Sequence, residues 1–389
     1  MISTSITAQE TNQTRFSISF GFFGQGAFFG MWGVLVPERS TSLGLDPLML
    51  ALFLLVIGIS LCTGIALVTR FEQHMPTASI LRLGGPILAL AITVCFLTLS
   101  LTVFYIAGIF IGIAAGLLEA GLNTQASQWE QQSERRGMSF FHAMFSAGML
   151  TGALIITSLL KMDIGVSMGI IASAAIYGIG MMTRARWVRE PAPSASATIA
   201  SISLNKTIII FLGALIFIST LIEGGVVDWS ALHLHQYHDL SLEEAGRPVL
   251  MFSLAMTLIR LVGDRLATYF QTHLLLAVPI LVAAVVLSLA LYNGQPTIII
   301  IAYSLLGLAL GNAFPLIIST AGRLSGNKPL RQISMIIAFA YFGLLTGPAL
   351  LGLIAHMINL NMTIMALAGL ALISGVASLS LPRILKFHG

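Results

Sequence analysis

The residues with the clearest chemical potential lie in the stretch LIEGGVVDWSALHL, residues 221–234. Glu223 and Asp228 are ionisable groups in an otherwise apolar run, where an uncompensated charge is strongly unfavourable. Because an acid in such a place is usually functional, Glu223 is predicted to bind a solute or to carry a proton. Asp228 and Trp229 are predicted to contribute to the same binding or coupling function, and to close its outer entrance. For Asp228, a helix cap or a hydrogen bond close to water is the alternative.

A glycine pair separates the two acids. Glu223 and Asp228 are five residues apart, and on a regular helix they differ by about 140° in direction. They therefore do not form a paired site unless the helix breaks. Gly224 and Gly225 are predicted to be a gating hinge, because glycine leaves helical geometry most easily and broken helices line the binding sites of transporters.

A third acid follows a stripe of small residues. Gly108, Gly112 and Gly116 recur every four residues, a spacing that lets two helices approach closely. On a helical wheel, Glu119 lies about 20° from Gly108 and Asn123 about 60°. We predict that Glu119 and Asn123 bind the solute or couple its movement to protons. A packing seam without a transport role is the alternative, above all for the glycines.

Three further side chains are candidates for a binding site. Gln25 and Trp32 are seven residues apart and share a helix face. Together they offer an amide and a flat apolar ring, which suits a sugar or another polyol; packing and interfacial anchoring are the alternative. His142 can relay protons, since histidine titrates near neutral pH, or it can be a buried hydrogen-bonding residue.

A second group of residues is predicted to act in gating. Arg260 and Asp264 are four residues apart, the spacing at which helix side chains pair. We predict that they form a clamp at the cytoplasmic end of their helix, with Gly263 and Arg265 in the same gate.

Other kinds of site receive little support from the sequence. His233, His235 and His238 are metal ligands by type, but we expect no metal because they fall in a short loop without a nearby cysteine. The phosphate-binding pattern Gly-x4-Gly-Lys-Ser/Thr is absent from the sequence, and no nucleophile–base set is visible. We therefore expect neither a cofactor nor an enzymatic reaction.

Composition defines the environment of these residues. Of the 389 residues, 57% are hydrophobic and 9% are charged, whereas soluble domains carry about 25% charged residues. The apolar residues recur in blocks of about 20, the length that crosses the roughly 30 Å hydrocarbon core of a bilayer. We predict an all-α integral membrane protein with twelve transmembrane helices. The predicted spans are 16–37, 48–69, 79–99, 102–127, 139–160, 163–184, 207–232, 248–270, 274–292, 296–322, 332–356 and 362–383.

The basic residues predict the orientation. If the N-terminus is cytoplasmic, all but three of the 19 Lys and Arg residues fall on cytoplasmic segments or helix ends. The exceptions are Arg39, Lys161 and Arg247. This asymmetry follows the positive-inside rule, so both termini are predicted to be cytoplasmic. The same rule accounts for the net charge of +4, and we expect no nucleic-acid partner.

The chain is predicted to consist of two pseudo-symmetric six-helix halves, residues 1–186 and 207–389. Residues 187–206 are polar and rich in Ala, Ser and Pro, as expected for a cytoplasmic linker. LVTRFEQH and LATYFQTH are 199 residues apart, and the glycines at 108 and 112 recur at 307 and 311. Such a duplication is typical of transporters that rock around a central site.

Several segments resemble a known family. RLVGDRLATYF, residues 260–270, is similar to the glycine–acid–arginine motif of the major facilitator superfamily between spans eight and nine. Its first-half copy, GIALVTRFEQH, is degenerate, with Thr69 where the family usually has an acid. GMWGVLVP, EAGLNTQASQWE, SFFHAMFSAG and EGGVVDWSALHL resemble a bacterial, sugar-permease-like branch. The resemblance implies the twelve-helix fold of that superfamily and an inner-membrane location, but no particular substrate.

We therefore hypothesise a secondary transporter that moves a small polar solute by alternating access, coupled to protons. The solute would be sugar-like or otherwise neutral or cationic, because few inward basic residues match the acids. Two alternatives are open: an exporter of amphipathic, drug-like compounds, and a sensor that uses the fold without turnover. The expected partners are the solute, protons and bilayer lipid, and we expect a monomer in the bacterial inner membrane.

Overall fold

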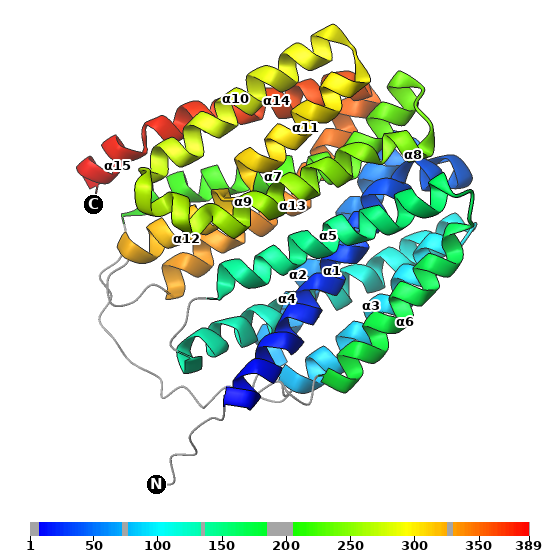
Figure 1. The fold of residues 1–389 in the computed structure, drawn as a ribbon, viewed down its shortest axis with the longest axis horizontal. Coiled ribbons are helices and arrows are strands. Elements are labelled where there is room, and N and C mark those ends of the chain that lie inside the picture. The colour runs from blue at the N-terminus through cyan, green and yellow to red at the C-terminus, as the bar shows by residue number, and fades with distance from the viewer. Residues whose placement is uncertain (1–7, 72–76, 134–136, 185–204, 325–329, 389) are drawn as a thin grey trace. The chain divides into compact units, whose positions relative to one another are not determined.

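The computed structural model describes residues 8–71, 77–133, 137–184, 205–324 and 330–388, and all regular elements in these ranges are α-helices (Figure 1). In chain order the helices are α1 Ala8–Leu43, α2 Pro47–Phe71, α3 Thr77–Leu97, α4 Leu101–Ser133, α5 Met138–Lys161, α6 Val166–Arg184, α7 Lys206–His238, α8 Leu242–Ala245, α9 Arg247–Tyr269, α10 Thr272–Asn293, α11 Pro296–Leu310, α12 Ala313–Leu324, α13 Leu330–Met357, α14 Leu360–Leu379 and α15 Leu381–His388.

Twelve membrane-length segments account for nearly all of these helices. By length and composition, the described part of the chain contains twelve spans that can cross a membrane. The short helix α8 and most of α9 together form the span Leu242–Gly263, and α11 with most of α12 forms Pro296–Ala321. The prediction of an all-α protein with twelve transmembrane helices is therefore confirmed.

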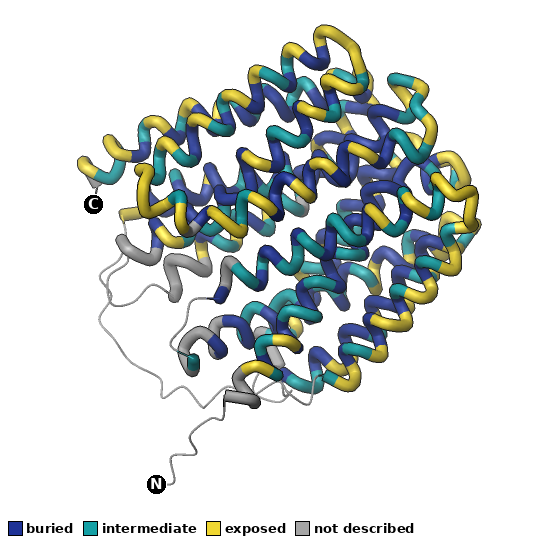
Figure 2. The backbone as a smooth tube through the Cα atoms, viewed as in Figure 1, coloured by how far each residue is buried: buried dark blue, intermediate teal, exposed yellow. Residues whose placement is uncertain are grey.

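The helices expose apolar side chains to the surroundings. Leu90 and Ile176 are each 67% exposed and Leu289 is 63% exposed. Exposed and buried positions alternate along many of the helices (Figure 2), so these helices have one buried side and one exposed side. In water a large apolar surface of this kind would drive association, whereas in a bilayer the lipid tails solvate it.

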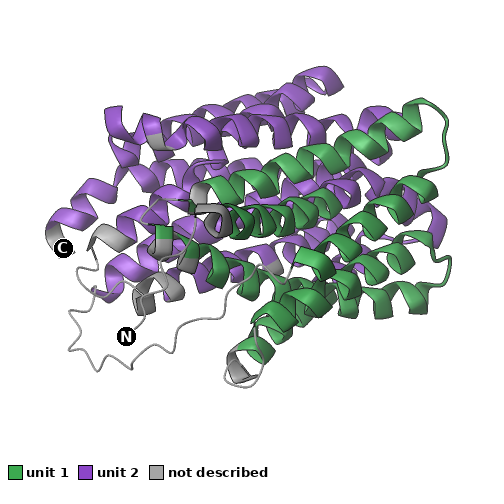
Figure 3. Cartoon of the chain, turned by 60° about the horizontal axis from the view of Figure 1, so that its bottom comes forward, with its two compact units in different colours: residues 1–29, 56–197 green, residues 30–55, 198–389 purple. Residues whose placement is uncertain are grey.

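The chain divides into two compact units, coloured separately in Figure 3. One unit contains residues Met1–Phe29 and Val56–Ala197, and the other contains Gly30–Leu55 and Thr198–Gly389. The division therefore runs through α1 and α2. Residues 30–55, which the sequence assigns to the N-terminal half, belong to the second unit.

Each unit has its own packing order. In the first unit, α3 packs against α4 and α6, and α5 packs against the same two helices. In the second unit, α7 packs against α13 and α14, α9 packs against α11, and α10 packs against α11 and α14. Helix α7 is therefore the central helix of the second unit, which matters because it carries Glu223 and Asp228.

Local signals set the ends of α7 and α14. Asn205 precedes α7, and its side chain accepts a hydrogen bond from the backbone N of Thr207 at 3.0 Å. Asp239 ends this helix in the left-handed conformation, at φ 53°. Asn359 begins α14 by accepting from the backbone N of Met362 at 2.8 Å. Such caps satisfy backbone groups that a helix terminus leaves unpaired.

Candidate functional site

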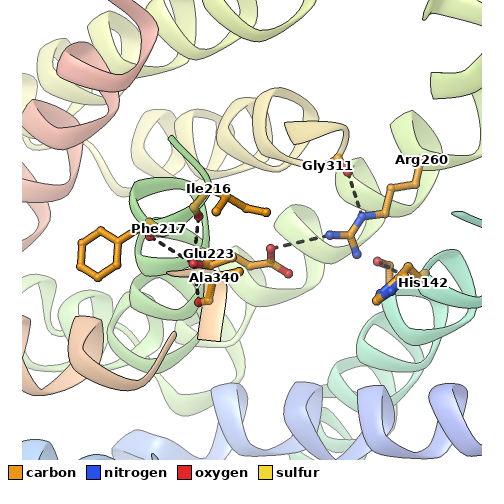
Figure 4. Close-up of polar contacts among 9 residues, drawn as sticks. His142, Ile216, Phe217, Glu223, Arg260, Gly311 and Ala340 are labelled. Atoms are coloured by element: carbon orange, nitrogen blue, oxygen red, sulfur yellow. Dashed lines mark hydrogen bonds and ion pairs between the residues drawn. The ribbon is translucent and has the colours of Figure 1, made fainter. Parts of the chain in front are cut away.

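The interior of the second unit contains an ion pair between two membrane spans. The guanidinium Nη2 of Arg260 on α9 lies 3.6 Å from Oε2 of Glu223 on α7, and their side chains are 8% and 17% exposed. Arg260 Nε also donates to the backbone oxygen of Gly311 at 2.9 Å. Figure 4 shows the carboxylate and the guanidinium facing each other. The pair joins α7, α9 and the end of α11.

Close packing of α7 on α13 fixes the position of Glu223. One turn earlier, the Thr220 hydroxyl donates to the backbone oxygen of Ala340 on α13 at 2.8 Å (Figure 4). A Cβ on Gly343 of α13 would overlap the Phe217 carbonyl oxygen. From this packed helix, the carboxylate of Glu223 lies 3.6 Å from the guanidinium of Arg260 on α9.

Arg260 is held by a break in the tenth span. Helix α11 ends at Leu310 and α12 begins at Ala313, with Gly311 and Asn312 in a turn between them. Asn312 is 7% exposed, and a Cβ on Gly263 would overlap its side-chain oxygen. Gly263 therefore allows α9 to approach the break closely. At this turn the backbone oxygen of Gly311 accepts a hydrogen bond from Nε of Arg260.

A second contact in this unit joins α1 to α7. The indole Nε1 of Trp32 donates to Oδ1 of Asp228 at 3.0 Å, and Asp228 is 3% exposed. Trp32 also packs against the ring of Phe53 on α2. These residues all belong to the second unit, because residues 30–55 do. The carboxylate of Asp228 is thus buried beside a neutral donor.

The outer half of α7 is packed rather than broken. Helix α7 runs without interruption from Lys206 to His238, so the break considered at the glycine pair is not found there. A Cβ on Gly225 would lie 2.6 Å from Leu351 Cδ1 and 3.0 Å from Leu367, whereas a Cβ on Gly224 would be 3.2 Å from its nearest neighbour. Gly225 therefore makes room for α13 and α14, and a hinge at this pair stays a prediction.

The aromatic neighbour of Asp228 is a packing residue in this structure. Trp229 is fully buried, and its indole Nε1 has no hydrogen-bond partner among the described residues. The donor to Asp228 is Trp32, which lies 196 positions away in the sequence. The sequence grouped Trp229 with Asp228 at an outer entrance, and that shared role stays a prediction; the hydrogen bond to Asp228 comes from Trp32.

The first unit brings together the two polar residues expected on α4. The amide nitrogen Nδ2 of Asn123 donates to Oε1 of Glu119 at 2.8 Å and to the Glu119 backbone oxygen at 2.9 Å. In the same unit, Gln25 and Glu119 are electrostatic neighbours of Tyr177 on α6, whose hydroxyl donates to the Gly21 oxygen at 3.3 Å. Gln25 is 9% exposed, and its Nε2 has no hydrogen-bond partner among the described residues.

The sequence matches a known protein family. The model of the Major Facilitator Superfamily matches residues 18–341. The chain belongs to the major facilitator superfamily. An uncharacterised MFS-type transporter of Yersinia pestis is 28% identical over 371 residues, which cover 94% of this chain and 95% of that protein. The membrane protein MosC of Rhizobium meliloti is 22% identical over 373 residues, covering 94% and 90%.

Solved structures share the fold. A bacterial homologue of the human lysosomal transporter Spinster, in an inward-facing and occupied conformation, has a TM-score of 0.77 and 11% identity, with 99% of both chains covered. A point mutant of the nucleoside transporter NupG has a TM-score of 0.74 and 13% identity, covering 94% of this chain and 99% of that chain. These similarities show the fold, and the superfamily membership with the twelve apolar helices indicates a multi-pass membrane protein of the transporter type.

The remaining residues predicted from the sequence lie outside the contacts described above, or their predicted pairing stays untested. His142 on α5 packs against the ring of Phe22, and its backbone oxygen accepts from Ser146. Arg265 is exposed. The side chain of Asp264 lies outside the described residues, so the Arg260–Asp264 clamp stays a prediction. Gln25 lies in the first unit and Trp32 in the second, so a shared polyol site on α1 stays a prediction too.

His233 and His235, near the end of α7, take part in internal hydrogen bonds. His233 is fully buried; its Nε2 lies 3.3 Å from the Asn361 side-chain oxygen and its Nδ1 lies 3.4 Å from the Tyr303 hydroxyl. Among the described residues, no group of three potential ligands is placed to hold a metal ion. These residues are in α7 and not in a loop, which corrects the placement made from the sequence.

Two features of the site were missed from the sequence. The break in the tenth span has a visible signal, since Gly311 and Asn312 are followed by Pro315, and these residue types interrupt helices. Tyr177 has no such signal, because a tyrosine in a span is common in membrane proteins. Its position beside Gln25 depends on how α6 packs against α1, which periodicity does not reveal.

Proposed function

We propose that this protein is a secondary active transporter that moves a small polar solute across the bacterial inner membrane by alternating access, coupled to protons. The ion pair between Glu223 and Arg260 carries this proposal. Two charges inside membrane spans are costly to keep, and within a transporter family the simplest use of them is contact with the solute or the coupling ion. Their partial exposure is consistent with that use.

Glu119 supports the coupling part of the proposal. It lies on α4 within a membrane span and is hydrogen-bonded by an uncharged amide, Asn123. A carboxylate in such a place can accept and release a proton as the protein changes state, and intramembrane acids commonly form proton pathways. Gln25, whose buried amide lies beside Tyr177, is a suitable donor to a solute.

The α1–α7 contact supports the gating part. If the basic residues orient the protein with both termini in the cytoplasm, Trp32 and Asp228 lie toward the periplasm. We propose that their hydrogen bond belongs to a gate on that side, which opens when residues 30–55 separate from α7. The proposal includes a monomeric protein, since the two units of one chain supply every residue named in it.

Flux measurement in proteoliposomes tests the proposal. Purified protein is reconstituted, and uptake of labelled sugars, polyols, amino acids and amines is measured with and without a pH gradient. Uptake that the gradient drives supports the proposal. Binding without flux would indicate a sensor instead, and flux restricted to amphipathic dyes would indicate the exporter.

A variant of Glu119 tests coupling separately from transport. Glu119→Gln retains size and hydrogen bonding but cannot titrate, so the response of uptake to the pH gradient should disappear. Glu243→Gln is the matched control, because it removes a carboxylate whose side chain is partly exposed and pairs with Arg247. If Glu119→Gln keeps the full response to the gradient, Glu119 has a structural role.

A further inference from the structure

We propose that the Glu223–Arg260 pair binds a zwitterionic solute of amino-acid type, with its carboxylate on Arg260 and its ammonium group on Glu223. This inference rests on the proposed transport function and specifies the class of solute. It begins from the geometry of the pair. The 3.6 Å separation is longer than the roughly 2.7–2.9 Å of a tight charge-assisted hydrogen bond, so the two groups are neighbours without being closely joined.

Charge compensation favours a solute that carries both signs. A solute that enters between Glu223 and Arg260 separates two charges that are mostly shielded from water. A sugar or polyol would leave both charges without an ionic partner, and a cation or an anion would leave one of them. A zwitterion replaces each lost partner with a new one, so the site stays neutral and both buried charges stay paired.

The anchoring of each group assigns the two ends of the solute. Arg260 is already held by the Gly311 carbonyl at the helix break, which fixes its planar guanidinium. A fixed guanidinium binds a carboxylate through two parallel hydrogen bonds more effectively than a flexible ammonium does. Glu223 lies on α7, next to the contact that Thr220 makes with α13. Because the two groups come from different helices, a small movement of α9 relative to α7 makes room for the solute.

A panel of matched compounds tests the solute class. The stability of detergent-purified wild-type protein is measured by thermal shift with each of the twenty common amino acids, with the amide of each and with the corresponding deaminated acid. Xylitol and glucose represent uncharged solutes. At least one amino acid should bind, with its amide and its deaminated acid at least about tenfold weaker, since each lacks one charge partner. A polyol that binds in preference to all amino acids overturns the inference, and so does a single-charge analogue that binds as tightly as its parent.

Variants of the pair provide the second readout. Arg260→Gln should abolish selectivity for the amino acid over its amide, and Glu223→Gln should abolish selectivity over the deaminated acid. Arg260→Lys should restore part of the binding, while Glu243→Gln should behave like wild type. Unchanged selectivity in folded Arg260→Gln protein would overturn the inference, because the carboxylate would then have another partner.

Flux separates this inference from the proposed function. If the reconstituted protein transports sugars or amines but no amino acid, the solute class is wrong and the transport function stands. If an amino acid binds with the expected selectivity and is not transported, the solute class stands and the transport function fails. If no amino acid in the panel binds, the zwitterion assignment is rejected whatever the flux measurements show.

Discussion

The two units contain the same kind of helix contact, with different chemistry. In the first unit, α2 and α4 meet at glycine: a Cβ on Gly112 would overlap the Ile57 carbonyl oxygen. In the second unit, α9 and α11 meet in the same way, and a Cβ on Gly307 would overlap the Phe252 carbonyl oxygen. We call these two contacts the glycine seams. Each of the two glycines has a counterpart 199 positions away, Gly311 for Gly112 and Gly108 for Gly307.

The difference between the seams lies in their charge. The residue 199 positions before Arg260 is Leu61, and the residue 199 positions before Gly311 is Gly112. Helix α4 continues through Gly112 to Ser133, whereas α11 ends at Leu310. Both copies have kept the close approach of two backbones, but only the second has an arginine and a helix break at it. The two seams therefore share their close packing, while the ion pair and the helix break occur at the second seam.

The largest expected effect comes from replacing Arg260, in the second seam, with leucine, the residue that stands 199 positions earlier at Leu61. Arg260→Leu leaves Glu223 without its ionic partner, and breaking a buried pair from one side costs about 3–5 kcal/mol of unfolding free energy. Adding Glu223→Leu should recover most of that stability, because an apolar pair can replace an ionic one, but it should not recover solute binding. Chemical denaturation in detergent measures the first effect and thermal shift with ligand the second. A double variant no more stable than Arg260→Leu would show that the ion pair is not the cause.

Alanine at the glycines tests whether the two seams are alike. Gly112→Ala and Gly307→Ala each place a methyl group against a backbone carbonyl that cannot rotate away, and we expect each to destabilise the protein by about 3 kcal/mol. Gly369→Ala is the control, because a Cβ there meets nothing within 4 Å. Denaturation midpoints compare the three variants. If either seam variant is as stable as Gly369→Ala, the comparison of the seams fails.

The sequence predicts those parts of the structure that depend on local pattern. Span length and hydropathy give the twelve helices, and the four-residue spacing of Glu119 and Asn123 places them on one side of α4, where the structure joins them by a hydrogen bond. The same spacing suggested Asp264 as the partner of Arg260, yet the described contacts of Arg260 are with Glu223 and Gly311, on other helices. Partners on distant segments follow from how helices pack, and single-sequence periodicity does not contain that information.

The helix break illustrates the same limit. A glycine pair at 224–225 is a conspicuous sign of a hinge, but α7 is continuous there and α13 and α14 fill the space beside it. The break found in the described residues lies at Gly311 and Asn312, and the sequence analysis used Gly311 only as the recurrence of Gly112. Glycine permits both close packing and a break, so the neighbouring helices decide which of the two occurs.

The α1–α7 contact extends the contrast between the halves. Asp228 stands 199 positions after Phe29, so the second half again carries a charge where the first is apolar. A double-mutant cycle of Trp32→Phe and Asp228→Asn should give a coupling energy of about 1.5 kcal/mol, the value of a hydrogen bond to a charged group. The same cycle with Trp229→Phe should give little coupling, because the Trp229 indole nitrogen has no partner in the part of the chain that the structure describes. Equal coupling for both tryptophans would mean that ring packing, and not the hydrogen bond, connects them to Asp228.

The smallest expected effect distinguishes a hinge from a packing glycine in α7. Gly26, 199 positions before Gly225, would place a Cβ into the Phe145 carbonyl oxygen, whereas Gly225 would place one 2.6 Å from the end of the Leu351 side chain. A side chain can move aside where a backbone cannot, so Gly225→Ala should cost about 1 kcal/mol. Gly224→Ala, with more space, should be nearly neutral.

Transport rates then separate stability from motion. If α7 bends at this pair during transport, both alanine variants should slow solute exchange in proteoliposomes, because alanine stiffens a helix at either position. If Gly225 serves only packing, Gly225→Ala should lower the unfolding free energy and leave exchange per folded molecule unchanged. Slow exchange in Gly224→Ala would decide for the hinge, since that variant alters flexibility with little change in packing.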